Sequence, residues 1–142
     1  IPELTGYDRL RREVRYGENS RIDVLLEDDS LEDCYVEIKC VTLHRPEGLH
    51  PTAAEFPDSV TKRGAKHLVE LTGMVAAGKR AVMLYLVFRG DCDHFRVAAD
   101  IDPAYSGALK SAMESGVEAI CYDCDITTKG IELASPLPVT RG

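Results

Sequence analysis

The chain has 142 residues, of which 44% are hydrophobic and 29% are charged, and these values predict one globular domain with a core of its own. Its longest apolar run, residues 81–88, is far shorter than the roughly 20 residues that span a bilayer, so we expect a cytoplasmic protein with no membrane partner. A formal net charge of −7 argues against non-specific nucleic-acid binding, which gains its affinity from lysine and arginine.

The first part of the chain predicts a helix and then a β-hairpin. In residues 3–14, leucine, tyrosine and valine recur near helical spacing, so we predict an amphipathic helix that Gly17 and Asn19 end. Residues 21–26 and 34–43 instead alternate between apolar and polar side chains, which indicates two strands. The acidic run between them is the expected turn.

The remainder predicts helices that alternate with strands. In chain order, we expect a long loop (44–57), a helix (58–78), a central strand (81–88), a short strand (94–98), a helix (102–115), a strand (117–122), a small hairpin (126–133) and a tail. A continuous apolar run such as 81–88 is typical of a strand that is covered on both faces, so helices should flank the sheet. The order predicts an α/β sandwich around a mixed central β-sheet.

The hairpin places two carboxylates opposite each other. A turn centred near Ser30 pairs residues whose numbers sum to about 60, and Asp23 and Glu37 satisfy this relation. Opposed side chains have Cβ atoms roughly 5 Å apart, and two like charges at that distance repel by roughly 3 kcal/mol at an effective dielectric near 20. A divalent cation would relieve that repulsion, and Mg²⁺ or Mn²⁺ prefers oxygen ligands. Lys39 lies on the same strand face as Glu37.

Two plainer interpretations stay open at this point. A Glu-x-Lys pair is common on a solvated, salt-linked sheet face, and a one-residue slip in register would separate Asp23 from Glu37.

The five cysteines, an odd number, indicate reduced thiols. Cys121 and Cys124 form a C-x-x-C spacing that suits zinc or redox chemistry, but one such pair is more often two strand thiols.

Several blocks of sequence resemble the sugar fermentation stimulation protein family. They agree with it in order and spacing, and they are Arg15-Tyr16-Gly17-Glu18-Asn19-Ser20-Arg21-Ile22-Asp23, Cys34-Tyr35-Val36-Glu37-Ile38-Lys39, Val41-Thr42-Leu43, Phe56-Pro57-Asp58-Ser59-Val60-Thr61, Arg63-Gly64, Lys66-His67-Leu68, Asp100-Ile101-Asp102, Gly116-Val117-Glu118 and Pro136-Leu137-Pro138-Val139. The resemblance implies that residues 1–142 form a single domain of the restriction-endonuclease-like, PD-(D/E)XK nuclease class. The family's preceding OB-type barrel has no counterpart in this chain.

The resemblance also implies a set of site residues. Asp23 and Glu37 would be the catalytic, metal-binding acids, with the Ile38 carbonyl as a further ligand and Lys39 as the motif lysine. Glu13 matches a carboxylate that some nucleases of this class use as an additional ligand, although a solvated helix face explains it equally well. Basic side chains near these positions would contact nucleic acid, and they are Arg15, Arg21, Arg63, Lys66 and His67.

These basic residues have ordinary explanations too. Arg63 and Lys66 share a helix face, where surface charge is common, and His67 is equally well a half-buried histidine. Residues 44–55 look longer than the corresponding segment of the family, which leaves their position over the site open.

The sequence therefore predicts a metal-dependent nucleic-acid-binding protein of nuclease ancestry that hydrolyses phosphodiester bonds, with DNA favoured over RNA and Mg²⁺ or Mn²⁺ as cofactor. The alternative is a non-enzymatic, DNA-binding regulator of sugar metabolism genes that kept the fold. A third reading is an interaction domain with an inert metal site. The sequence indicates neither the oligomeric state nor the strand structure of a substrate.

Overall fold

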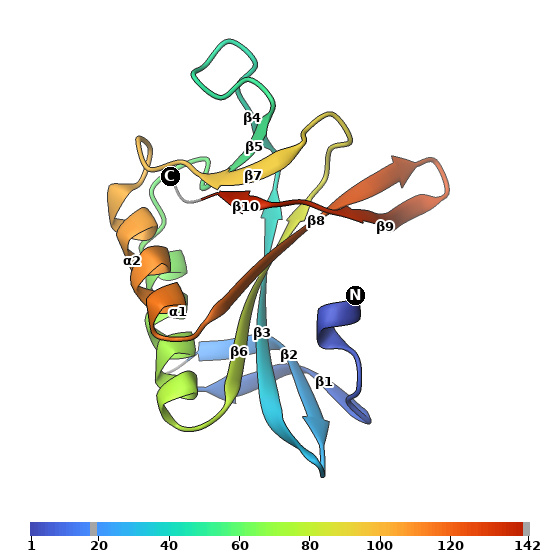
Figure 1. Ribbon diagram of the computed structural model, residues 1–142, viewed down its shortest axis with the longest axis vertical. Helices are drawn as coiled ribbons and strands as arrows, with labels where there is room; N and C mark the ends of the chain where they lie inside the picture. Colours follow the sequence, from blue (N-terminus) through green and yellow to red (C-terminus); the bar gives the residue numbers. More distant parts are fainter. Residues whose placement is uncertain (18–19, 141–142) are drawn as a thin grey trace.

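A computed structural model describes residues 1–17 and 20–140, and in these residues the chain forms two β-sheets and two α-helices (Figure 1). The larger sheet has the strand order β1-β2-β3-β6-β8-β9. Its strands are β1 (Arg9–Tyr16), β2 (Ser20–Asp28), β3 (Leu31–Val41), β6 (Arg80–Val87), β8 (Glu118–Thr127) and β9 (Gly130–Pro136). The pairs β3–β6 and β6–β8 are parallel and the outer pairs are antiparallel, so the sheet is mixed, as the sequence predicts.

The smaller sheet lies beyond the ends of β3 and β6 and has the order β10-β7-β5-β4 (Figure 1). Its strands are β4 (Leu43–His44), β5 (Ala53–Phe56), β7 (His94–Val97) and β10 (Val139–Thr140). Only β7 was predicted. β4 begins at Leu43, the last residue of the predicted strand 34–43, and the expected loop 44–57 supplies His44 and all of β5. The expected tail supplies part of β9 and all of β10.

The first segment corrects the predicted helix over residues 3–14. A short 3-10 helix, η1 (Pro2–Leu4), is followed by β1, which pairs with β2 in an antiparallel ladder from Arg9↔Glu27 to Tyr16↔Ser20. Most of β1 is exposed, so the spacing of its few apolar residues carries no information about a buried helix face. Gly17 follows β1 with a positive φ of 55°, while Asn19, the other predicted terminator, lies outside the described residues.

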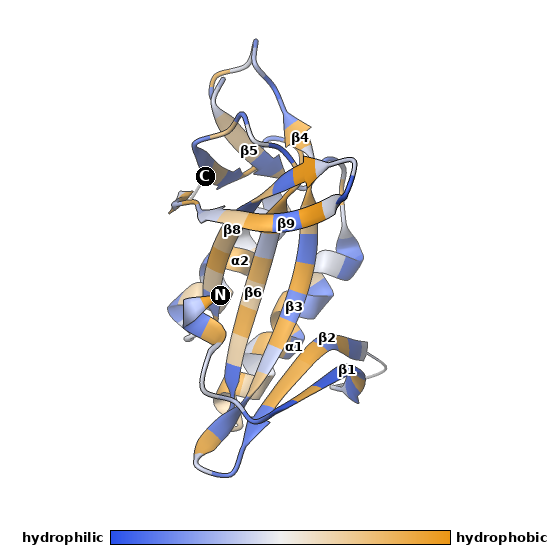
Figure 2. Cartoon of the chain, turned by 90° about the vertical axis from the view of Figure 1, so that its right-hand side faces the viewer, coloured by the Kyte–Doolittle hydropathy of each residue, from blue (hydrophilic) through white to orange (hydrophobic). Residues whose placement is uncertain are grey.

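Both helices pack against the same face of the larger sheet (Figures 1 and 2). Helix α1 (Lys62–Ala76) begins after Thr61, whose hydroxyl accepts from the Gly64 amide, and α2 (Pro103–Glu114) begins after Asp102, whose carboxylate accepts from the Tyr105 amide. The N-cap of α1 is therefore Thr61 rather than the predicted Asp58, three residues later. The expectation that helices cover both faces is wrong. Neither described helix is long and apolar enough to cross a membrane.

The two faces of the sheet carry separate hydrophobic clusters. The helix face contains the larger one, which includes the fully buried Tyr85 of β6 and Tyr105 of α2. On the opposite face, Val36, Val82 and neighbouring side chains are covered in part by the N-terminal segment. The central strands β3 and β6 are largely hydrophobic in Figure 2. The N-terminal segment thus takes the place of the second helical layer that the apolar run 81–88 predicts.

Candidate functional site

The register of the β2–β3 hairpin brings Asp23 next to Glu37. The ladder pairs Val24 with Val36 and Leu25 with Tyr35, so the predicted sum of 60 is confirmed over this stretch. At Asp23 the regular backbone pairing ends, and the Asp23 Oδ2 accepts a 2.8 Å hydrogen bond from the Ile38 amide. A carboxylate is thereby inserted between the two strands where they part.

Glu37 is the centre of a compact polar cluster on the helix face. Its Oε1 lies 3.6 Å from Lys39 Nζ and 3.3 Å from His67 Nδ1 of helix α1, and Lys39 Nζ lies 3.1 Å from the same Nδ1. The Nδ1 atom holds at most one proton, so it either donates to Glu37 or accepts from Lys39. Glu37 is 4% exposed, and its Oε2 is buried with no hydrogen-bond partner.

Burial and charge shift the two acids in opposite directions. Burial raises the pKa of Asp23, with a further rise from the Glu37 charge, although the Ile38 amide opposes the change. Burial also acts to raise the pKa of Glu37, but His67, Lys39 and a hydrogen bond from Asp23 outweigh it, and the pKa of Glu37 lies below its ordinary value. Environments that separate the pKa values of two neighbouring carboxyls are common at functional sites.

Two side chains that sequence analysis did not assign to the site also border it. The Tyr16 hydroxyl and the Glu70 Oε2 are both buried without a hydrogen-bond partner. Burial raises the pKa of Tyr16, and so do the charges of Glu37, Glu70 and Asp23. A signal was present in the sequence, because Glu70 follows His67 by three positions and so lies on the same helix face.

The predicted basic residues converge beside this cluster. Arg21, Arg63, Lys66 and His67 line a pocket of about 360 Å³ together with Ser20. Lys66 also lies 3.7 Å from Glu70 Oε1. The pocket joins β2 to α1, and His67 is both one of its walls and the contact of Glu37.

Glu13 and Arg15, the remaining predicted site residues, lie on β1 rather than on a helix. Arg15 is exposed and pairs in register with Arg21, which extends the basic surface from the pocket. Glu13 is exposed and has a positive φ of 54°. It falls between two ladder pairs, Arg12↔Val24 and Val14↔Ile22, and so lies opposite Asp23. A local distortion of β1 therefore occurs at the position that faces the site.

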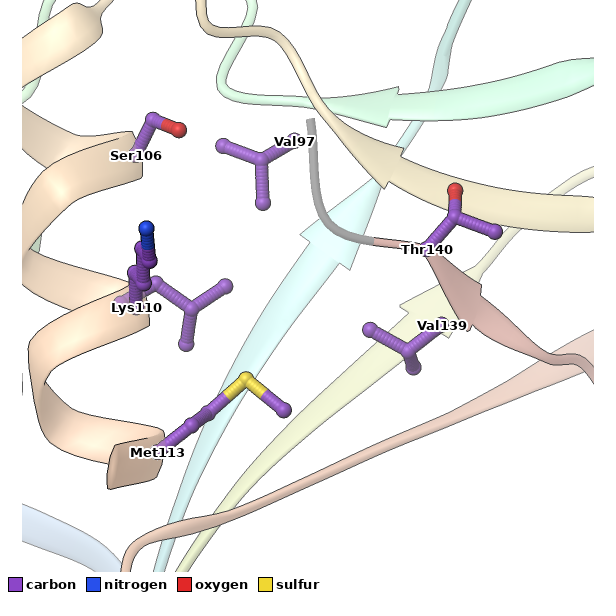
Figure 3. Close-up of a pocket in the computed structure, with 7 residues that line it drawn as sticks. Val97, Ser106, Lys110, Met113, Val139 and Thr140 are labelled. Atoms are coloured by element: carbon purple, nitrogen blue, oxygen red, sulfur yellow. The ribbon is translucent and has the colours of Figure 1, made fainter. Parts of the chain in front are cut away.

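The other features noted in the sequence lie apart from this cluster. Cys121 and Cys124 are buried free thiols of β8, and burial raises the pKa of Cys121 to about 12. A second cavity, of about 320 Å³, separates α2 from β7 and β10 (Figure 3). Val97, Leu109, Met113 and Val139 give it apolar walls, and none of the predicted site residues lines it.

The fold and the site together define a mixed α/β protein in which a buried carboxylate and a lysine of a central strand meet a histidine of helix α1 beside a basic pocket. A family model described as "Sugar fermentation stimulation protein RE domain" matches residues 1–130. The chain therefore belongs to the sugar fermentation stimulation protein (SfsA) family.

Curated relatives agree with this assignment. The chain is 55% identical over 139 residues to a sugar fermentation stimulation protein homolog from Roseobacter denitrificans, covering 98% of this chain and 57% of that protein. It is 61% identical over 131 residues to a homolog from Rhodospirillum centenum, covering 92% of this chain and 54% of that protein. The chain thus spans a little more than half the length of the curated relatives it matches.

A solved structure agrees as well. The structure of Pyrococcus furiosus SfsA in complex with Ca²⁺ superposes with a TM-score of 0.86 at 31% sequence identity, over 99% of this chain and 58% of that one. The agreement extends over 99% of this chain, so the two proteins share this fold.

Proposed function

We propose that the chain is a metal-dependent, nucleic-acid-binding domain of the restriction-endonuclease-like PD-(D/E)XK class that hydrolyses phosphodiester bonds of DNA. The observation that carries the proposal is the convergence of Asp23, Glu37 and Lys39 where β2 and β3 part, with one Glu37 oxygen buried and without a partner. A buried unpaired carboxylate oxygen is costly, and it is a ligand atom for a hard cation.

The donor set fits Mg²⁺ or Mn²⁺, which take one or two carboxylates and leave the other positions to water and phosphate. Asp23 and Glu37 would hold the ion together with the Ile38 carbonyl. Glu13, which falls between the ladder pairs Arg12↔Val24 and Val14↔Ile22, is an additional candidate. Burial is the main cause of the raised pKa of Asp23, and the neighbouring Glu37 charge adds to it. The Ca²⁺ complex of the Pyrococcus furiosus relative supports a site for a hard cation in this family.

When bound, such an ion polarises a phosphate and lowers the pKa of a coordinated water. Side chains of this chain would orient the water, stabilise the developing charge and bind phosphates. The Lys39 ammonium, held between Glu37 and His67, orients an attacking water or stabilises charge that develops on the phosphoryl oxygens. Arg21 and Arg63, with Lys66, would bind neighbouring phosphates in the pocket that these residues line.

One observation favours the alternative of a non-enzymatic DNA-binding regulator. The Glu37 Oε1 is already within ion-pair distance of both Lys39 and His67, and these contacts reduce the need for a metal at that oxygen. A protein that kept the fold and the basic pocket but lost turnover would look the same around Glu37. The two functions differ in whether a phosphodiester bond is broken.

The deciding experiment is cleavage of a panel of single-stranded, duplex and branched DNA and RNA in the presence of Mn²⁺ or Mg²⁺. We expect the wild type to cleave at least one DNA substrate, and we expect chelator and the Glu37→Gln substitution to abolish cleavage. The matched control is Glu32→Gln, the same change at an exposed position of the same strand, which should leave cleavage unchanged. Metal binding without cleavage of any substrate would instead establish the regulator.

A further inference from the structure

A second group of metal-ligating side chains lies away from the Asp23–Glu37 pair, between β4 and the loop that joins β6 to β7. His44 ends β4, while Asp91 and Cys92 belong to the loop. One ligand atom from each of the three lies within 4.8 Å of the others. Within residues 1–17 and 20–140, no other trio of histidine, cysteine and acidic residues meets this distance.

The neighbours of His44 set the tautomer of its neutral ring. Its Nε2 lies 2.7 Å from the Pro51 carbonyl oxygen, and since a carbonyl only accepts, Nε2 carries the proton. In the neutral ring, Nδ1 then presents its lone pair to the Arg89 guanidinium at 3.2 Å. A histidine that donates one ring nitrogen to a backbone carbonyl and turns the other toward a carboxylate has the arrangement of a metal ligand with its supporting hydrogen bond.

The cluster holds a cationic group in the structure. Asp91 Oδ2 lies 3.5 Å from the His44 Nδ1. In the neutral tautomer these two atoms are both acceptors, and a positive group beside them offsets their repulsion. Arg89 meets this need, because its guanidinium donates to both Asp91 oxygens at 2.9 and 2.8 Å as well as to His44. The Cys92 thiol completes the group, 3.7 Å from Asp91 Oδ1.

We propose that His44 Nδ1, the Asp91 carboxylate and the Cys92 sulfur form a site for a zinc-like divalent ion, with Arg89 as the cation that the ion displaces. Nitrogen, sulfur and one carboxylate are the donors that Zn²⁺ takes in four-coordinate sites, with water in the fourth position. Typical Zn–N, Zn–O and Zn–S bond lengths imply separations of roughly 3.3–3.6 Å between ligand atoms, so the three groups need to approach by only about 1 Å. Cys92 would release its proton to solvent on binding.

The position of the cluster indicates what the ion would do. Cys92 is buried in the core of the helix face, while Asp91 is exposed and so is free to adjust. His44 is linked to Pro51 at the other end of the following loop. An ion at this place would tie the 45–52 loop to the β6–β7 loop. The inference does not depend on the proposed nuclease function.

Titration of the chain with Co²⁺ tests the proposal, because a cobalt–thiolate bond gives a charge-transfer band in the near ultraviolet. We expect one equivalent of Co²⁺ to produce that band and Zn²⁺ to remove it by competition. The Cys92→Ser variant should lose the band and weaken Zn²⁺ binding by more than about 100-fold, since loss of a supporting group alone costs about 10–100-fold. Cys40→Ser, at an exposed free thiol of β3, should keep both.

Two further variants make the outcome specific. Arg89→Ala removes the competing cation, so it should bind Zn²⁺ more tightly than the wild type, the opposite of the effect expected from simple damage to the loop. Glu37→Gln should leave the thiolate band unchanged, which separates this site from the proposed catalytic one. A band that is absent in the wild type, or that survives Cys92→Ser, would overturn the proposal, and so would weaker binding by a folded Arg89→Ala variant.

Discussion

The hydrogen bond between Tyr85 and Tyr105 should show strong non-additivity when its two hydroxyls are removed in turn. The oxygens are 2.6 Å apart, and both side chains are fully buried. The Tyr105→Phe variant loses this bond and leaves the buried Tyr85 hydroxyl without a hydrogen-bond partner. Removing one partner of a buried hydrogen bond and leaving the other unsatisfied costs about 1–3 kcal/mol, so we expect a decrease of about 1–3 kcal/mol in the free energy of unfolding.

The double variant Tyr85→Phe/Tyr105→Phe leaves no hydroxyl without a partner. Its decrease in the free energy of unfolding should be smaller than the sum of the two single decreases by at least about 1 kcal/mol. Urea-induced unfolding measures both quantities, provided that the dependence on denaturant is unchanged. Tyr35→Phe, at a half-buried tyrosine of β3, is the control and should have a small effect. Additive losses in the double variant would refute the reasoning, because they would mean that the two hydroxyls do not depend on each other.

Two other predictions follow from single contacts. Gly116 has φ +110° and an added Cβ would lie 3.0 Å from Val75 Cγ1, so Gly116→Ala should destabilise the fold by more than about 1 kcal/mol. Gly73 lies in open space within α1, so Gly73→Ala should stabilise the fold by about 1 kcal/mol. Urea unfolding measures both variants, and equal effects on the free energy of unfolding would contradict the argument. The hydrogen bond from Arg45 lowers the pKa of Asp100 from 3.8 to about 2. The contribution of this hydrogen bond to stability is therefore fully present above pH 3.8 and is lost as the pH falls through about 2. Asp100→Asn should therefore lose less stability than the wild type over this pH range in acid-unfolding measurements, and a loss equal to that of the wild type would count against the Arg45 contact.

The centre of the candidate site was accessible from sequence because it depends on local contacts. A hairpin with a short turn fixes its own register, so the sum rule that placed Asp23 opposite Glu37 agrees with the observed pairing of Val24 with Val36. Strand alternation then placed Lys39 on the same face as Glu37. The start of α2 beside Asp102 was also predicted, as the helix over 102–115, because a capping side chain acts within one helical turn. The metal and the chemistry assigned to these residues stay predictions.

The parts that sequence reasoning missed depend on contacts between distant segments. Strand β1 is mostly exposed and is held by its ladder with β2, so its own apolar spacing misleads toward a helix. The smaller sheet joins short pieces such as β5 and β10, which are too short for periodicity to reveal.

What the sequence by itself determined is the acidic hairpin and the alternation of strands and helices after it, since these follow from neighbouring residues and from periodicity. Only the tertiary structure decided which side chains complete the site. His67 meets Glu37 and Lys39 because α1 packs on the face of the sheet that carries them, and His44 meets Cys92 because β4 lies close to the β6–β7 loop. Such meetings are set by packing over long sequence separations, which no local pattern encodes.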